Sequence, residues 1–163
     1  MVKIYRACTI LLRLMAMAAV ITAAVVMATS RETTTYFNLT LKADFTQTPS
    51  FKFFLVANCI AALYSIFALF APSAGLVSRW VIVFDVTIAM LLTSAMAAAL
   101  AIAQVGKKGN VHAGWLPICD QVPKYCNHVM GALISGFVGL LFYTLIVFYT
   151  ISTELNPLLP GSK

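Results

Sequence analysis

Charged side chains are scarce in this chain of 163 residues, because they make up only 10% of its composition. An average soluble domain carries about 25% charged and about 45–50% apolar residues. Here 61% of the residues are hydrophobic, so too few polar side chains remain to cover the surface of a soluble protein. The composition excludes an ordinary cytoplasmic enzyme, a disordered chain and a small disulfide-rich secreted domain. It indicates a polytopic membrane protein whose surface mostly faces lipid.

Acidic residues are the scarcest of the charged residues, since five of them stand against eleven lysines and arginines. The five lie in different segments, so no pair of carboxylates is placed for acid–base chemistry, and no G-x-S-x-G, Walker or H-E-x-x-H motif occurs. The net charge of +6 is spread through the connecting segments and forms no clustered basic patch of the kind that binds nucleic acid. We therefore expect no enzymatic activity, no cofactor, no metal and no nucleic-acid partner. The cations are instead placed to flank a lipid bilayer.

Four apolar stretches are long enough to cross a membrane, for which a helix needs roughly 20 mostly apolar residues. They cover about residues 7–28, 53–71, 80–103 and 129–151. Together they predict an all-α membrane fold, a four-transmembrane-helix bundle that forms a single domain over residues 1–163. A signal peptide remains an alternative for the first stretch, because Lys3 and Arg6 give it a basic start. Arg13 lies deep in that stretch, however, and no clear stop follows it.

The orientation in the membrane is predicted from two chemical signals. Basic residues do not decide it, because five would lie on the side of the termini and six on the opposite side. Asn38-Leu39-Thr40 is a glycosylation acceptor in the first long connection. Cys119 and Cys126 lie in the third connection, and a cysteine pair there suits an oxidising compartment. Both signals place these connections outside the cytoplasm, so we expect cytoplasmic N- and C-termini.

Arg13 and Asp85 are the two charges that lie inside predicted spans. A charge near the bilayer centre costs about 2.5–3.5 kcal/mol, so each needs a reason to be there. Both lie about 8–10 Å below the membrane face on the side of the termini, at 1.5 Å per helical residue. Their equal depth and opposite sign predict an intramembrane ion pair between the first and third spans. Arg13 alone could snorkel to the headgroups, but the short Asp85 side chain could not. A proton or ion relay is a weaker alternative, because it would need further ionisable groups.

Small residues form a second pattern in the spans. Gly131, Ser135 and Gly139 recur every four residues and therefore share one face of the fourth predicted helix. Faces of this kind let helix backbones approach closely in lipid. They predict helix packing, either within one bundle or between chains, and the sequence does not separate the two.

The cysteines are interpreted by their positions. Cys119 and Cys126 are seven residues apart and can close a small disulfide loop before the fourth span, which would stabilise that loop by about 2–3 kcal/mol. His112 and His128 could complete a zinc site with them, but the spacing matches no common zinc motif. Cys8, at the membrane edge, is a weak candidate for palmitoylation.

The order of these features resembles the CASP-like proteins, plant four-span relatives of the Casparian strip membrane domain proteins and distant relatives of MARVEL proteins. The group-one branch is the most similar. The resemblance covers nearly the whole chain and depends on an Arg in the first span, an Asp in the third, an alanine-rich end of that span, and a cysteine pair followed by a Gly-Ser motif. These residues are Leu11-Leu12-Arg13-Leu14, Val83-Phe84-Asp85, Leu92-Thr93-Ser94-Ala95, Ala103-Gln104-Val105-Gly106, Gly109-Asn110, Trp115, Cys119, Cys126 and Gly131-Ala132-Leu133-Ile134-Ser135-Gly136-Phe137.

The resemblance implies a multi-pass protein of the plasma membrane that acts as a structural scaffold. Its partners would be copies of itself or related four-span proteins, the lipid bilayer, and secreted wall-modifying enzymes such as peroxidases. The family's Arg/Asp pair carries over to Arg13 and Asp85. The segment Thr33–Asn38 of the first connection does not look like the first extracellular loop of the Casparian strip members, so a general membrane-domain scaffold is expected here.

A small transporter or channel-like four-span protein is the alternative function. It predicts a wet cavity that crosses the membrane and is lined by polar groups, whereas a scaffold should be dry between its helices. The second and fourth spans offer few polar side chains, which favours the scaffold.

Overall fold

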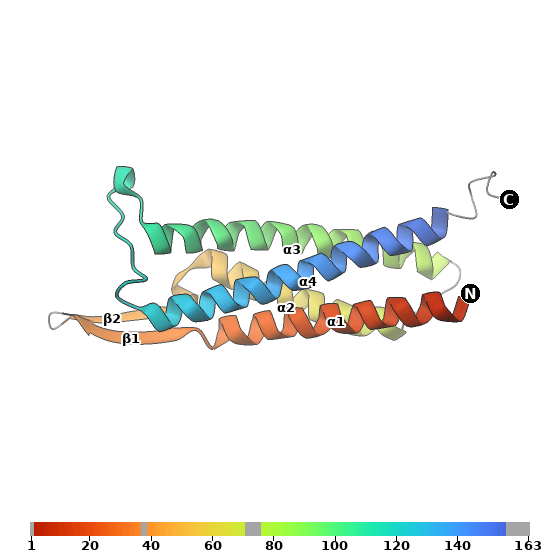
Figure 1. Cartoon of the computed structure of the whole chain (residues 1–163), viewed down its shortest axis with the longest axis horizontal. Helices are drawn as coiled ribbons and strands as arrows, with labels where there is room; N and C mark the ends of the chain where they lie inside the picture. The colour runs from red at the N-terminus through yellow and green to blue at the C-terminus, as the bar shows by residue number, and fades with distance from the viewer. Residues whose placement is uncertain (1, 37–38, 71–75, 156–163) are drawn as a thin grey trace.

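The computed structural model of this chain describes residues 2–36, 39–70 and 76–155 (Figure 1). Four long helices cover most of them: α1 Val2–Ala28, α2 Pro49–Phe70, α3 Leu76–Lys108 and α4 Pro123–Leu155. Each contains a stretch long and apolar enough to cross a membrane, which confirms the four predicted spans. The proposed glycosylation site, Asn38, lies outside the described residues.

The helices extend beyond the predicted apolar stretches, because hydropathy marks the part of a helix that lies in lipid and not its ends. Lys107 and Lys108 in the last turn of α3 favour continuation, since cations stabilise the negative end of the helix dipole. Pro123 begins α4, and proline is well tolerated in a first turn. A helix of 33 residues is about 50 Å long, so α3 and α4 reach past a hydrocarbon core of about 30 Å.

The four helices form a ring in the order α1, α2, α3, α4. Helix α1 packs against α2 and α4, and α3 packs against the same two helices, so α1 and α3 are diagonal to each other, as are α2 and α4. Helix α1 begins and α4 ends at the same end of the bundle, while the first and third connections lie together at the opposite end (Figure 1). We call this opposite end the hairpin end.

A β-hairpin that the sequence analysis did not predict lies in the first connection. Strands β1, Arg31–Tyr36, and β2, Leu39–Asp44, are antiparallel, with Arg31 opposite Asp44 and Tyr36 opposite Leu39. A run of threonines in β1 suits a strand, because β-branched side chains pack well on a pleated surface. A short 3-10 helix, η1 Phe45–Gln47, follows, and its Thr46 N–H donates to the Asp44 carboxylate at 3.0 Å and thereby lowers the pKa of Asp44.

The hairpin end is tied together by several polar contacts. The backbone N–H of Tyr125 in the first turn of α4 donates to Glu32 of β1 at 2.8 Å, which fills one of the unpaired donors of the helix start with an anion. In the third connection, the Gly106 carbonyl accepts from Ile118 N–H at 2.9 Å. Gly109 has a φ of +67°, and a Cβ there would lie 2.6 Å from the Trp115 carbonyl oxygen, so only glycine fits. Hairpin, third connection and α4 therefore form one connected unit.

Candidate functional site: a polar layer inside the helix bundle

Arg13 and Asp85 meet in the interior of the bundle, in the half nearer the termini. The guanidinium donates to both carboxylate oxygens, at 2.9 Å from Nη1 to Oδ1 and 2.6 Å from Nη2 to Oδ2. This two-pronged geometry is the strongest arrangement for an ion pair. Asp85 is fully buried and Arg13 is nearly so, which means that Arg13 does not snorkel to the membrane surface. The structure brings together the two charges that the sequence paired, and they join the diagonal helices α1 and α3.

Tyr64 of α2 adds a third group to this pair. Its hydroxyl lies 2.8 Å from Asp85 Oδ1 and 3.0 Å from the Val81 carbonyl, so its single proton is shared between two acceptors on α3. The Asp85 carboxylate therefore receives donors from α1 and α2 at once. A buried charge needs this degree of hydrogen bonding, because desolvation otherwise costs more than pairing returns.

Tyr143 of α4 forms a second polar contact across the other diagonal of the ring. Its hydroxyl donates to the Ala61 carbonyl of α2 at 2.7 Å, and the Ser65 hydroxyl lies 2.5 Å from the Tyr143 hydroxyl oxygen. Because Tyr143 gives its proton to the carbonyl, Ser65 is the donor in the second bond. Both side chains are buried, and no charge is involved.

We call Arg13, Tyr64, Ser65, Asp85 and Tyr143 the polar layer. Every helix contributes to it, and every polar atom of these side chains that lies in the interior has a partner within the chain. A different polar side chain, Asn58 of α2, is 1% exposed; its amide nitrogen donates to the Phe54 carbonyl, and its oxygen has no partner among the described residues.

Tyr64, Ser65 and Tyr143 were not predicted as site residues from the sequence. A tyrosine in an apolar span resembles any other large side chain until the facing helices are known. One signal was present, since a hydroxyl buried in a membrane span needs a partner.

The small-residue stripe on α4 packs against α1 of the same chain. Ser135 donates to the Ala19 carbonyl at 2.9 Å, and a Cβ on Gly139 would lie 2.8 Å from Val20. Gly131 has more room, because the nearest atom to its Cβ position is 3.9 Å away, on Val26. Of the two interpretations that the sequence left open, packing within the bundle accounts for this face.

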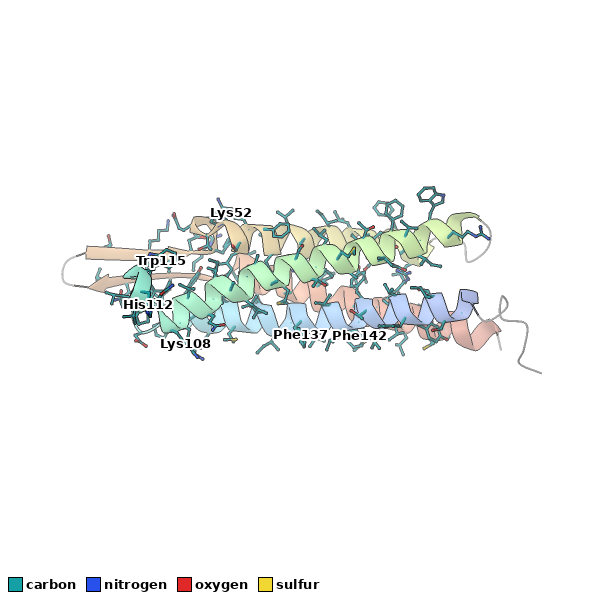
Figure 2. All side chains as sticks on the ribbon, turned by 90° about the horizontal axis from the view of Figure 1, so that it is seen from above. Lys52, Lys108, His112, Trp115, Phe137 and Phe142 are labelled. Atoms are coloured by element: carbon teal, nitrogen blue, oxygen red, sulfur yellow. A yellow bond between two sulfur atoms is a disulfide. The ribbon has the colours of Figure 1, made fainter. Side chains whose placement is uncertain are left out.

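The cysteines of the third connection, Cys119 and Cys126, form a disulfide with their Cα atoms 5.6 Å apart. They are therefore not free to bind zinc with His112 and His128, and no cluster suited to a metal occurs among the described residues. Figure 2 shows His112, Trp115 and Lys108 at the hairpin end. Cys8 is half-buried and unpaired.

Two cavities in the described part of the chain lie away from the polar layer. One is below the third connection at the hairpin end, and the other is a groove on the outer face between α3 and α4. Neither is lined by Arg13, Tyr64, Asp85 or Tyr143. With its charges paired and its hydroxyls bonded, the polar layer joins the four helices through their side chains.

Comparison with known proteins gives a family match over most of the chain. Residues 3–142 match the Casparian strip membrane protein domain. Similar proteins include CASP-like protein 1C2 of Vitis vinifera, 54% identical over 91% of this chain and 92% of the relative. CASP-like protein 1C3 of Populus trichocarpa is 49% identical over 98% of this chain and 93% of the relative. CASP-like protein 1C1 of Arabidopsis thaliana is 47% identical over 92% of each. No solved structure matches.

Proposed function

Because this chain belongs to the Casparian strip membrane protein domain family, in agreement with the resemblance read from its sequence, we propose that it is a structural scaffold. It associates with copies of itself or with related four-span proteins and so builds domains in the plasma membrane. Its multi-pass membrane character rests on the four spans. The scaffolding role, the assembly and the plasma-membrane location are what we propose.

The observation that carries the proposal is the closed interior of the bundle. A transporter needs polar groups that are free to meet a solute or an ion. Here Arg13 and Asp85 neutralise each other, Tyr64 adds a further hydrogen bond to the pair, and the described cavities avoid them. A bundle whose interior polar groups are paired in this way supports a structural scaffold better than a transporter or channel.

The association surface is expected on α3, because the stripe on α4 is already occupied by α1. A shallow groove of about 380 Å³ lies on the outer face between α3 and α4. Its α3 wall includes a row of small residues one turn apart, Ala89, Thr93 and Ala97, of which the last two are exposed, and it is flanked by Val86 and Met90. A small-residue face of this kind lets a second helix approach closely in lipid.

The orientation and the outer partners follow from the hairpin end. Its disulfide suits an oxidising compartment, which supports an extracellular hairpin end and cytoplasmic termini. Exposed apolar side chains there, Val111 and Leu116, offer a surface to proteins outside the cell. Secreted wall-modifying enzymes are the partners we propose for it.

Energy transfer between two fluorescently labelled copies in plant plasma membrane tests the assembly. Ala97→Phe fills the α3 groove and should lower the transfer to the level of an unrelated four-span protein. Ala18→Phe, on the exposed face of α1, is the matched control and should leave transfer unchanged. Equal transfer for both variants would place association elsewhere, and no transfer by the unaltered protein would contradict self-assembly.

A further inference from the structure

A pocket of about 460 Å³ lies beneath the third connection, where α2, α3 and α4 meet at the hairpin end. Its walls are mainly apolar and include Phe51, Ile102, Ile118, Val129 and Met130. The size is within the range of about 300–1,000 Å³ that is typical of ligand sites in proteins. We call it the loop pocket. Neither the family nor the polar layer accounts for it.

The loop pocket lies across the expected boundary between hydrocarbon and headgroups. Ile102, Ala103, Val129 and Met130 belong to the ends of the predicted apolar stretches, and Lys107 lies just beyond. Ile102 and Met130 line the pocket and are 37% and 40% exposed, so the pocket is open at these apolar helix ends. A chain from the surrounding bilayer can therefore enter it without crossing water.

The polar side of the loop pocket carries a cation. Lys107 lines it together with Thr48 and Asn127, and no carboxylate pairs with Lys107 among residues 2–36, 39–70 and 76–155. An ammonium group at the membrane boundary attracts anionic lipid headgroups. The apolar walls of the loop pocket suit a hydrocarbon chain, and the unpaired Lys107 at its polar side suits an anionic headgroup. The pocket is therefore complementary to an anionic amphiphile.

We propose that the loop pocket binds a single membrane phospholipid with an anionic headgroup. One acyl chain lies between Ile102, Val129 and Met130, and the headgroup phosphate contacts Lys107. The disulfide closes the site from above, because Cys119 and Cys126 are both part of its wall. The bound lipid fills the space between three helix ends that would otherwise be open.

Native mass spectrometry of the full chain, purified in mild detergent after reconstitution with phosphatidylglycerol, tests the proposal. The unaltered protein should retain one phospholipid. Ala103→Phe places a ring in the loop pocket and should reduce the retained lipid to about one tenth, whereas Ala101→Phe, two residues away and outside the pocket, should retain it. Equal retention by the two variants would overturn the proposal.

A second pair of variants tests the headgroup contact and does not alter the packing. Lys107→Gln should reduce the preference for phosphatidylglycerol over phosphatidylcholine by about fivefold, the effect of one lysine near a charged headgroup. Lys108→Gln removes the neighbouring charge, which lies outside the pocket, and should leave the preference unchanged. Equal loss in both would mean general surface attraction and would overturn the site.

Competition with oleate distinguishes a phospholipid from a free fatty acid. The two ligands differ in mass, so the spectrum identifies which one is retained. Retention of oleate in place of phospholipid at equal concentration would contradict the proposal.

Discussion

Replacing Asp85 by asparagine should destabilise the protein severely, although the side chain keeps its size. The carboxylate accepts three hydrogen bonds, two from Arg13 at 2.9 and 2.6 Å and one from Tyr64 at 2.8 Å. Asp85→Asn removes the negative charge and turns one acceptor into a donor that faces the Arg13 guanidinium. An uncompensated buried charge costs about 3–5 kcal/mol. That is a large part of a typical folding free energy of about 5–15 kcal/mol.

Thermal unfolding in detergent measures this cost, and delivery of a fluorescent fusion to the cell surface gives a second readout. A loss of about 3–5 kcal/mol corresponds to a fall of about 6–20 °C in Tm for a chain of this size. Thr87→Ala on the exposed face of the same helix is the control, with an expected change within about 0.5 kcal/mol.

The contact itself is tested by two double variants. Adding Arg13→Met to Asp85→Asn removes the orphaned charge and should restore about 1–3 kcal/mol. The exchange Arg13→Asp with Asp85→Arg should restore part of the surface delivery. If the effects of the single substitutions simply add, and the exchange rescues nothing, the reasoning from a direct ion pair is refuted.

Three other variants address the remaining contacts. Tyr143→Phe removes the second hydrogen bond to the Ala61 carbonyl and leaves the buried Ser65 hydroxyl without its acceptor, so it should cost about 1–3 kcal/mol in thermal unfolding; an unchanged Tm would contradict the second diagonal contact. Gly136→Ala would place a Cβ 2.6 Å from the ring of Phe54 and should cost about 1–3 kcal/mol, while Gly131→Ala, with 3.9 Å of room, should cost little; equal effects would argue against the tight approach. Cys119→Ser should lower the stability by about 2–3 kcal/mol relative to the oxidised protein, and free thiols at both positions in unreduced material would exclude the link.

Sequence reasoning succeeded where a single residue or run carries the whole signal. About twenty consecutive apolar residues are typical of a membrane-spanning helix, so the four spans could be predicted. A charge inside such a span needs a partner of opposite sign, so the Arg13–Asp85 contact could be predicted as well. The pairing of Cys119 with Cys126 followed in the same way, because few other arrangements suit two cysteines in one short connection.

It failed where the signal depends on what faces a residue. Tyr143 hydrogen-bonds to α2 because the arrangement of the four helices directs its side chain across the ring. The sequence of α4 alone does not determine that direction. The close approach of Gly136 to Phe54 also depends on how α4 faces α2. The four-residue spacing predicted only Gly131, Ser135 and Gly139 as packing residues. The hairpin was missed although Leu39, Leu41 and Ala43 alternate with polar residues in β2, because β1 is polar up to its last residue and offers no matching alternation.

The two diagonal contacts of the polar layer bear on how several copies can come together. A bundle with weakly joined helix pairs can exchange one pair with its neighbour and form an intertwined dimer by domain swapping. Here α1 is joined to α3 and α2 to α4 through the middle of the ring, so removing any helix breaks a buried polar contact inside its own chain. Exchange of a helix between folded copies must first break such a contact and is therefore slow, so the assemblies proposed above would grow by adding subunits that are already folded. Subunits added in this way could leave and be replaced without unfolding, so the make-up of a proposed membrane patch would follow the local supply of folded chains.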